Sequence, residues 1–205
     1  MKYNWFAIQL VIVCVIVFIF QIVYEPLTDQ FALVSAVVLA NPWTIVTSIF
    51  LHGSFEHLFY NMFALGLFGS VLERIIGGKK FLILFFVSGV IAGMGSILFY
   101  TASIGASGAI FGIIGTLGVL RPRMRVYMGY GVPMPMAVAV VLWAIGDLIG
   151  LFAPSEVANA AHLFGLAFGL LLGFYLRKQY KETQIKRKEP KIDEEEFEEW
   201  EDEWM

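Results

Sequence analysis

Charged residues are scarce in this chain of 205 residues. Only 15% of them are charged, against roughly 25% in an ordinary soluble domain, whereas 59% are apolar, against roughly 45–50%. Too few polar side chains remain to cover a soluble surface, and no basic excess favours binding of nucleic acid. These shortages exclude a typical soluble enzyme, a disordered chain and a nucleic-acid binder. The class that remains is a polytopic membrane protein.

Cysteine is nearly absent as well. The single cysteine, Cys14, lies in an apolar stretch, so the chain can form no internal disulfide and no cysteine-based metal site. Histidine is limited to three positions, which are His52, His57 and His162. Two of them, His57 and His162, lie inside predicted membrane spans, where polar groups are costly.

Apolar runs predict an all-α fold with six transmembrane helices. A bilayer core of about 30 Å requires about 20 apolar helical residues. Residues 25–54 are expected to form a long loop, partly embedded in the outer leaflet, because Asn41-Pro42 ends the short apolar stretch 31–40. The expected spans are 5–24, 55–73, 81–100, 107–120, 132–152 and 158–176.

Basic residues predict how the spans are oriented. They occur only at the amino terminus, after the second and fourth spans, and after the sixth, whereas the remaining connections carry no Lys or Arg. The positive-inside rule therefore places both termini in the cytoplasm of a multi-pass cell-membrane protein. Residues 177–205 form a composition break with seven basic and eleven acidic residues. We expect a membrane domain over 1–176 and a flexible, charged cytoplasmic tail over 177–205.

Several polar side chains are predicted to lie at one depth in the membrane, where such groups are costly. At about 1.5 Å per helical residue, Ser107, His162, Asn61 and His57 lie about 20–26 Å above the cytoplasmic basic residues of their own spans. His52 is expected near the outer interface. The fourth span has only 14 residues, so Ser107 at its start must lie within the membrane. Irregular backbone at that depth is tolerated only against protein or in a water-filled cavity, and we expect a water-filled cavity that opens outward, with Ser107 at its floor.

This combination of residues is suited to acyl transfer. Serine is a weak nucleophile unless a base takes its proton, and His162 is the only plausible base for Ser107. The Asn61 amide, His57 and the backbone N–H of Ser107 are candidate donors to a developing oxyanion. Asp147 is expected on the outer part of the fifth span and not as a third member, so a Ser-His dyad is predicted.

Three motifs resemble those of the rhomboid intramembrane serine proteases. Gly105–Gly108 matches the family's G-x-S-G at the start of the fourth span, and His57 with Asn61 matches His-x-x-x-Asn in the second. The sixth span matches Ala-His-x-x-Gly-x-x-x-Gly. The resemblance implies that Phe111 stacks on the catalytic histidine and that the Gly105 loop serves oxyanion stabilisation. The residues that match the sixth-span motif are Ala161, His162, Gly165 and Gly169. The resemblance further implies that four residues support the site, namely His52, Gly108, Gly165 and Gly169.

The resemblance implies an intramembrane serine endopeptidase that uses an acyl-enzyme on Ser107. It would hydrolyse peptide bonds in or near transmembrane segments of membrane-protein substrates, within the lipid bilayer and without a metal or organic cofactor. The alternative is a catalytically inactive rhomboid-like protein that binds client transmembrane segments. The sequence leaves the substrate and the oligomeric state open.

Overall fold

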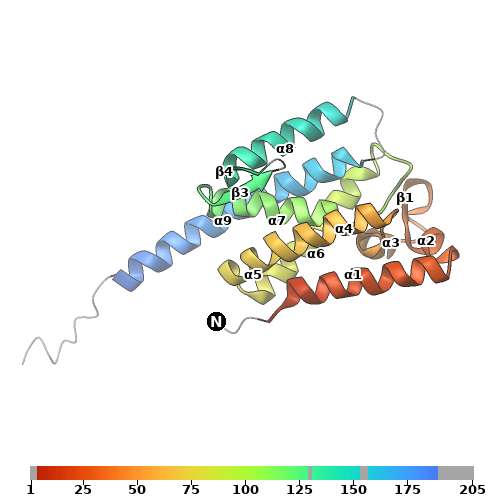
Figure 1. Ribbon diagram of the computed structural model, residues 1–205, viewed down its shortest axis with the longest axis horizontal. Coiled ribbons are helices and arrows are strands. Elements are labelled where there is room, and N and C mark those ends of the chain that lie inside the picture. Colours follow the sequence, from red (N-terminus) through yellow and green to blue (C-terminus); the bar gives the residue numbers. More distant parts are fainter. Residues whose placement is uncertain (1–3, 129–130, 153–156, 189–205) are drawn as a thin grey trace, which may run out of the picture.

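The computed structural model describes residues 4–128, 131–152 and 157–188. Long helices lie side by side along one axis and make up most of these residues (Figure 1). One helical stretch is interrupted by a π turn, η3, which separates α4 from α5. The helical elements of the bundle are α1 (Phe6–Val23), α4 (Phe55–Ala64), η3 (Leu65–Gly69), α5 (Ser70–Ile76), α6 (Gly78–Ser96), α7 (Ser107–Leu120), α8 (Met136–Gly150) and α9 (Asn159–Lys188).

Four helical stretches in the described part of the chain are long and apolar enough to cross a membrane. They are Phe6–Val23, Phe55–Ile76, Gly78–Ser96 and Asn159–Gln179. The apolar helices α7 and α8 are shorter, and the bounds of α7 coincide with those predicted for the fourth span. These helices are those of a polytopic membrane protein.

The connections contain more structure than the sequence suggested. The expected loop 25–54 holds α2 (Pro26–Phe31), β1 (Leu33–Val34), η1 (Ser35–Val37), α3 (Thr44–Thr47) and η2 (Ser48–Phe50). β1 pairs in antiparallel fashion with β2 (Ala102–Ser103), which ties this loop to the segment that precedes α7. β3 (Arg125–Met128) and β4 (Val132–Pro135) form a hairpin before α8. The fold is therefore mostly rather than purely helical.

Two helix ends differ from the ends of the expected spans. The fifth span was expected from residue 132, but α8 begins at Met136, because the preceding residues are extended in β4. The sixth span was expected to end at residue 176, but α9 continues to Lys188, into the segment expected to be the tail. The strongly acidic part of the tail, residues 189–205, lies outside the described residues.

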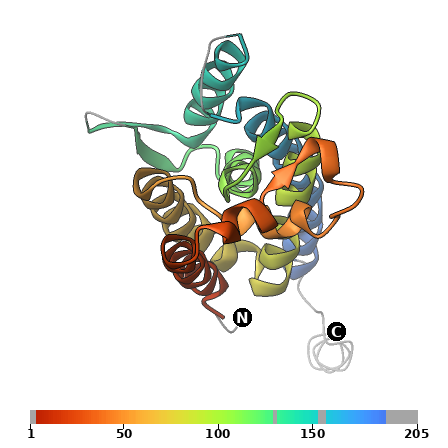
Figure 2. The ribbon, with the colours of Figure 1, turned by 90° about the vertical axis from the view of Figure 1, so that its right-hand side faces the viewer.

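Helix α7 occupies the middle of the bundle. Seen along the helices, it is surrounded by the other elements, whereas α8 stands at the edge (Figure 2). Eleven of its 14 residues are buried, and Ser107 itself is only partly exposed. An apolar helix without a polar face is expected at such a central position.

Glycines bring α7 and α9 into backbone contact. A Cβ atom on Gly165 would clash with the carbonyl oxygen of Gly108, and one on Gly169 would clash with that of Gly112. The Thr116 hydroxyl lies within hydrogen-bonding distance, 2.9 Å, of the carbonyl oxygens of both Gly112 and Gly169. Such a close approach of two helices is usual where small residues face each other in membranes.

A buried carboxylate joins the first helix to the second span. Glu73 on α5 is 1% exposed and accepts hydrogen bonds from the backbone N–H groups of Phe6 and Ala7, at 3.1 and 3.0 Å. These groups begin α1 and have no partner within their own helix. Glu73 therefore caps α1 from a distant part of the chain.

Candidate active site

Ser107 is the first residue of α7 and follows a segment that is anchored on two sides. The backbone N–H of Gly105 donates to the Ser48 carbonyl at 2.8 Å, and the hydroxyls of Ser96 and Ser103 lie 2.7 Å apart. Gly105 has φ of 121°, a conformation that a residue with a side chain rarely adopts. This turn lets the chain descend to the first turn of α7.

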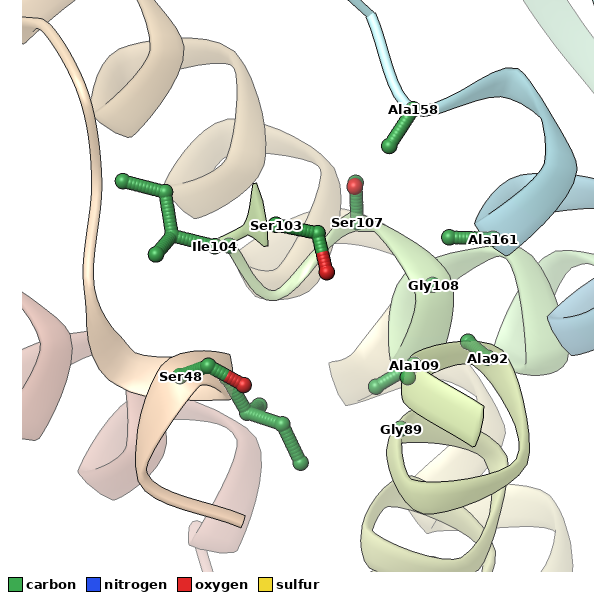
Figure 3. A pocket seen from close by; sticks show the side chains of 13 residues that line it. Ser48, Gly89, Ala92, Ser103, Ile104, Ser107, Gly108, Ala109, Ala158 and Ala161 are labelled. Atoms are coloured by element: carbon green, nitrogen blue, oxygen red, sulfur yellow. The ribbon is translucent and has the colours of Figure 1, made fainter. Parts of the chain in front are cut away.

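A small cavity of about 30 Å³ adjoins Ser107. The Ser107 hydroxyl extends from the start of α7 toward Ala158, on the segment leading into α9 (Figure 3). The hydroxyl-bearing residues Ser48 and Ser103 also line it, together with backbone and small side chains from α6, α7 and α9. Such a cavity has room for about one or two water molecules.

His57 lies directly against the loop that carries Ser107. A Cβ atom on Gly105 would be 2.7 and 2.8 Å from Cε1 and Nε2 of the His57 ring. The backbone N–H of Gly53 donates a long hydrogen bond, 3.4 Å, to Nδ1 of His57. In neutral His57 this arrangement leaves the proton on Nε2, the nitrogen beside Gly105. The ring therefore presents a donor to the Ser107 loop.

The position of His57 follows from the start of its helix. Ser54 precedes α4 and its hydroxyl accepts a hydrogen bond from the His57 backbone N–H at 3.1 Å, as an N-cap does. One turn later Asn61, which is buried, donates from its amide to the His57 carbonyl at 2.9 Å. This bond uses one of the two amide hydrogens of Asn61.

His52 packs on His57 behind this donor. The two rings are 5.1 Å apart between centroids in an edge-to-face arrangement, and His52 is 1% exposed. Neither ring nitrogen of His52 has a hydrogen-bond partner within the described residues. Burial lowers the pKa of His52 to about 4, and repulsion by a charge on His57 acts in the same direction. His52 is therefore neutral near pH 7.

His162, in the first turn of α9, is held on two sides. The ring of Phe111, one turn after Ser107 on α7, lies parallel to the imidazole, with centroids 4.2 Å apart and an angle of 7°. On the other side Nδ1 of His162 lies 2.9 Å from Oδ1 of Asp147 on α8, and both residues are buried. The imidazole thus lies beside the first turn of α7.

The contact with Asp147 corrects the expectation that this residue lies away from the site. Asp147 lies in the last turn of α8, and the rotation of this helix turns the carboxylate toward His162 on α9. A signal was available in the sequence, because an ionisable residue inside a membrane span normally requires a partner. The contribution of Ser48 to the cavity had no comparable signal.

The structure brings the predicted residues together from three elements. His57 contacts the loop before Ser107, Ser107 opens α7, and His162 lies against Phe111 one turn below. Across the described residues no hydrogen bond joins the Ser107 hydroxyl to His162, and no group of three His, Cys, Asp or Glu residues is placed to hold a metal ion. Catalytic hydrogen bonds are often loose in the absence of substrate. The arrangement offers a hydroxyl beside a small cavity, an imidazole one helical turn along α7 and a hydrogen-bond donor against the Gly105 loop.

Known proteins provide an independent comparison. The model of the Rhomboid domain family matches residues 39–179. The chain is 34% identical over 137 residues to the rhomboid protease GlpG of Yersinia pseudotuberculosis and, equally, to that of Yersinia pestis, covering 65% of this chain and 48% of each relative. It is also 34% identical over 135 residues to YdcA of Bacillus subtilis, covering 64% of this chain and 66% of that protein.

The matches cover the part of the chain that forms the site. The matched region is about half of the length of the GlpG relatives. The family-model match over residues 39–179 includes α4, α7 and most of α9, with all the residues that surround the cavity beside Ser107. Because the family model covers more than half of the chain, this membrane protein belongs to the rhomboid family.

Proposed function

We propose that this protein is an intramembrane serine endopeptidase with Ser107 as the nucleophile and His162 as the general base. The observation that carries the proposal is the position of His162, stacked on Phe111 one helical turn from Ser107, which itself lines a small cavity within the bundle. Two of the relatives are named rhomboid proteases, which agrees with this chemistry. Substrates would be membrane proteins cleaved in or near a transmembrane segment.

The proposed reaction has two halves. In the first, Nε2 of His162 accepts the Ser107 proton while Oγ bonds to the scissile carbonyl carbon. The C–N bond then breaks, and the same proton passes to the leaving amine, which gives an acyl-enzyme on Ser107. In the second half His162 takes a proton from water, the hydroxide oxygen bonds to the acyl carbon, and the Ser107 oxygen leaves with the proton.

Negative charge develops on the carbonyl oxygen in both halves and needs donors already in place. His57 supports this role, because its Nε2 lies beside Gly105 and its Nδ1 is occupied as an acceptor. The backbone N–H of Ser107 is one of the unpaired groups at the start of α7. The free hydrogen of the Asn61 amide is the third candidate. Losing one such donor typically lowers kcat by about 10²–10³.

The cavity beside Ser107 supports a hydrolytic second half. Its volume suits about one or two water molecules, and the hydroxyls of Ser48 and Ser103 are polar partners for water there. Water must reach the acyl-enzyme inside a membrane, where bulk water is excluded. A polar cavity next to the nucleophile meets this need without any cofactor.

We also propose the membrane arrangement expected from the sequence. The short helices α7 and α8 would complete six spans together with the four long stretches. Both termini would lie in the cytoplasm, because the basic residues cluster on that side, and the cavity would open outward. Residues 1–176 would form the catalytic membrane domain, although α9 continues beyond this boundary.

The test is cleavage of a tagged single-span reporter by the purified protein in liposomes. Wild type and Ser70→Ala, a control serine on α5 that does not line the cavity, should cleave it. Ser107→Ala and His162→Ala should not. Cleavage by Ser107→Ala would refute the assigned nucleophile, and cleavage by His162→Ala would refute the dyad.

The runner-up function is a catalytically inactive rhomboid-like protein that binds client transmembrane segments. The observation in its favour is that Ser107 and His162, both among the described residues, make no hydrogen bond with each other. A serine-directed fluorophosphonate separates the two functions without a known substrate. Labelling of wild type and Ser70→Ala but not of Ser107→Ala supports the protease; absence of labelling from all three supports the inactive relative.

A further inference from the structure

We infer that Asp147 is a positioning residue for His162, holding the imidazole in the tautomer and orientation that general-base catalysis by this ring requires. The inference rests on the proposed protease function and goes beyond the Ser-His dyad. Its starting observation is the 2.9 Å contact between Oδ1 of Asp147 and Nδ1 of His162, which joins α8 to α9. The two residues are 15 positions apart, so the contact is a product of the fold.

Both partners are buried, so the contact is shielded from water. Asp147 is 7% exposed and His162 is 9% exposed. A carboxylate in such a place is costly unless a donor satisfies it. The second oxygen, Oδ2, is buried and has no hydrogen-bond partner within the described part of the chain. The His162 ring is therefore the group on which Asp147 depends.

The contact determines which imidazole nitrogen is free. A carboxylate accepts, so Nδ1 of His162 carries a proton and donates it to Oδ1. In the neutral ring Nε2 then has a lone pair, which is the state needed to accept the Ser107 proton. Without Asp147, either nitrogen of the neutral ring can carry the proton, and molecules with Nε2 protonated are unable to act as the base.

The ring plane is restrained at the same time. Stacking on Phe111 confines the imidazole to one plane, and the bond at Nδ1 prevents rotation within that plane. Together the two contacts fix the direction in which Nε2 points. When His162 takes the Ser107 proton it becomes positively charged, and the carboxylate stabilises this charge, which arises during the reaction. Asp147 gains and loses no proton itself.

Kinetics of Asp147→Asn test the positioning role. The variant is nearly isosteric, but its amide can donate to Nδ1 and so favour the unproductive tautomer. We expect kcat for the reporter to fall by about 10- to 1000-fold, with KM changing by less than about threefold, since the carboxylate acts on the base rather than on substrate binding. The matched control is Asp29→Asn, at an exposed aspartate of α2, which should retain wild-type kcat.

Nitrogen NMR of the histidine rings gives a readout that does not require activity. The chain has only three histidines, so ¹⁵N-histidine labelling in liposomes yields few signals, and those of His162 are identified by their loss in His162→Gln. In wild type at a pH where the ring is neutral we expect a protonated Nδ1 and an unprotonated Nε2. Asp147→Asn should reverse this pattern, and Asp147→Ala should give a mixture of both tautomers.

The outcomes distinguish the inference from the proposed function. If wild type cleaves the reporter and Asp147→Asn cleaves it equally fast, the positioning role is refuted while the protease stands. A lower kcat with an unchanged His162 tautomer also overturns the inference, because Asp147 would then be a structural tie between helices. If wild type neither cleaves the reporter nor is labelled by fluorophosphonate, the proposed function fails. The NMR comparison of wild type with Asp147→Asn then still decides whether Asp147 determines the tautomer of His162.

Discussion

Replacing Gly105 with alanine is the most direct test of the role given to His57. The new Cβ atom would lie 2.7 Å from Cε1 and 2.8 Å from Nε2 of the ring, whereas ordinary van der Waals contact begins at 3.4 Å. The ring must therefore move by about 0.6–0.7 Å if the loop stays in place. In addition, φ of 121° is strained for alanine, which costs about 1–3 kcal/mol.

The displacement is large enough to affect an oxyanion donor. Misplacement of a catalytic group by about 1 Å can lower a rate by about 10². We therefore expect kcat of Gly105→Ala to fall by about 10- to 100-fold, and the free energy of unfolding to fall by about 1–3 kcal/mol. Steady-state cleavage of the liposome reporter measures the first effect, and thermal unfolding in detergent measures the second.

The control is Gly146→Ala on α8, where an added Cβ atom would meet no other atom within 4 Å. It should retain both the activity and the stability of wild type. Wild-type kcat for Gly105→Ala, in protein shown to be folded, would refute the placement of His57 as a donor at the Ser107 loop. A loss of stability without any loss of kcat would show that the glycine serves only the turn.

Three further substitutions test the supports of the site. Phe111→Leu removes the ring on which His162 stacks, so kcat should fall several-fold in protein shown to be folded; an unchanged kcat in the reporter assay would show that stacking is dispensable. Thr116→Val removes the hydroxyl that faces carbonyls on both glycine-lined helices and should lower the free energy of unfolding by about 0.6–2 kcal/mol, measured by denaturation in detergent; equal stability would contradict the bridging role. Glu73→Ala leaves two N–H groups at the start of α1 without acceptors and should cost about 1–3 kcal/mol in the same assay. If Glu73→Ala unfolds at the wild-type temperature, the long-range cap is not a stabilising contact.

Features that depend on one helix at a time could be predicted from the sequence. The bounds of α7 follow from its basic end and from the short apolar run, and depth along a helix follows from counting residues. The approach of α7 to α9 was also predictable, because glycines at a spacing of four residues mark a helix face on which backbones can meet.

Features that depend on rotation and on distant pairing could not be predicted. Whether Asp147 faces lipid or His162 depends on the rotation of α8, which tertiary packing determines. The π turn at Leu65–Gly69 changes the face presented by the second half of its span, and no composition signal marks it. The pairing of β1 with β2 joins two-residue strands far apart in the chain, too short for a strand pattern to be recognised.

The contacts around the site indicate where its rigidity resides. The helices that carry Ser107 and His162 meet through backbone atoms at Gly108 and Gly165, so their separation cannot shrink, and Thr116 links them further along. The distance between the proposed nucleophile and its proposed base is therefore determined by helix packing rather than by flexible loops.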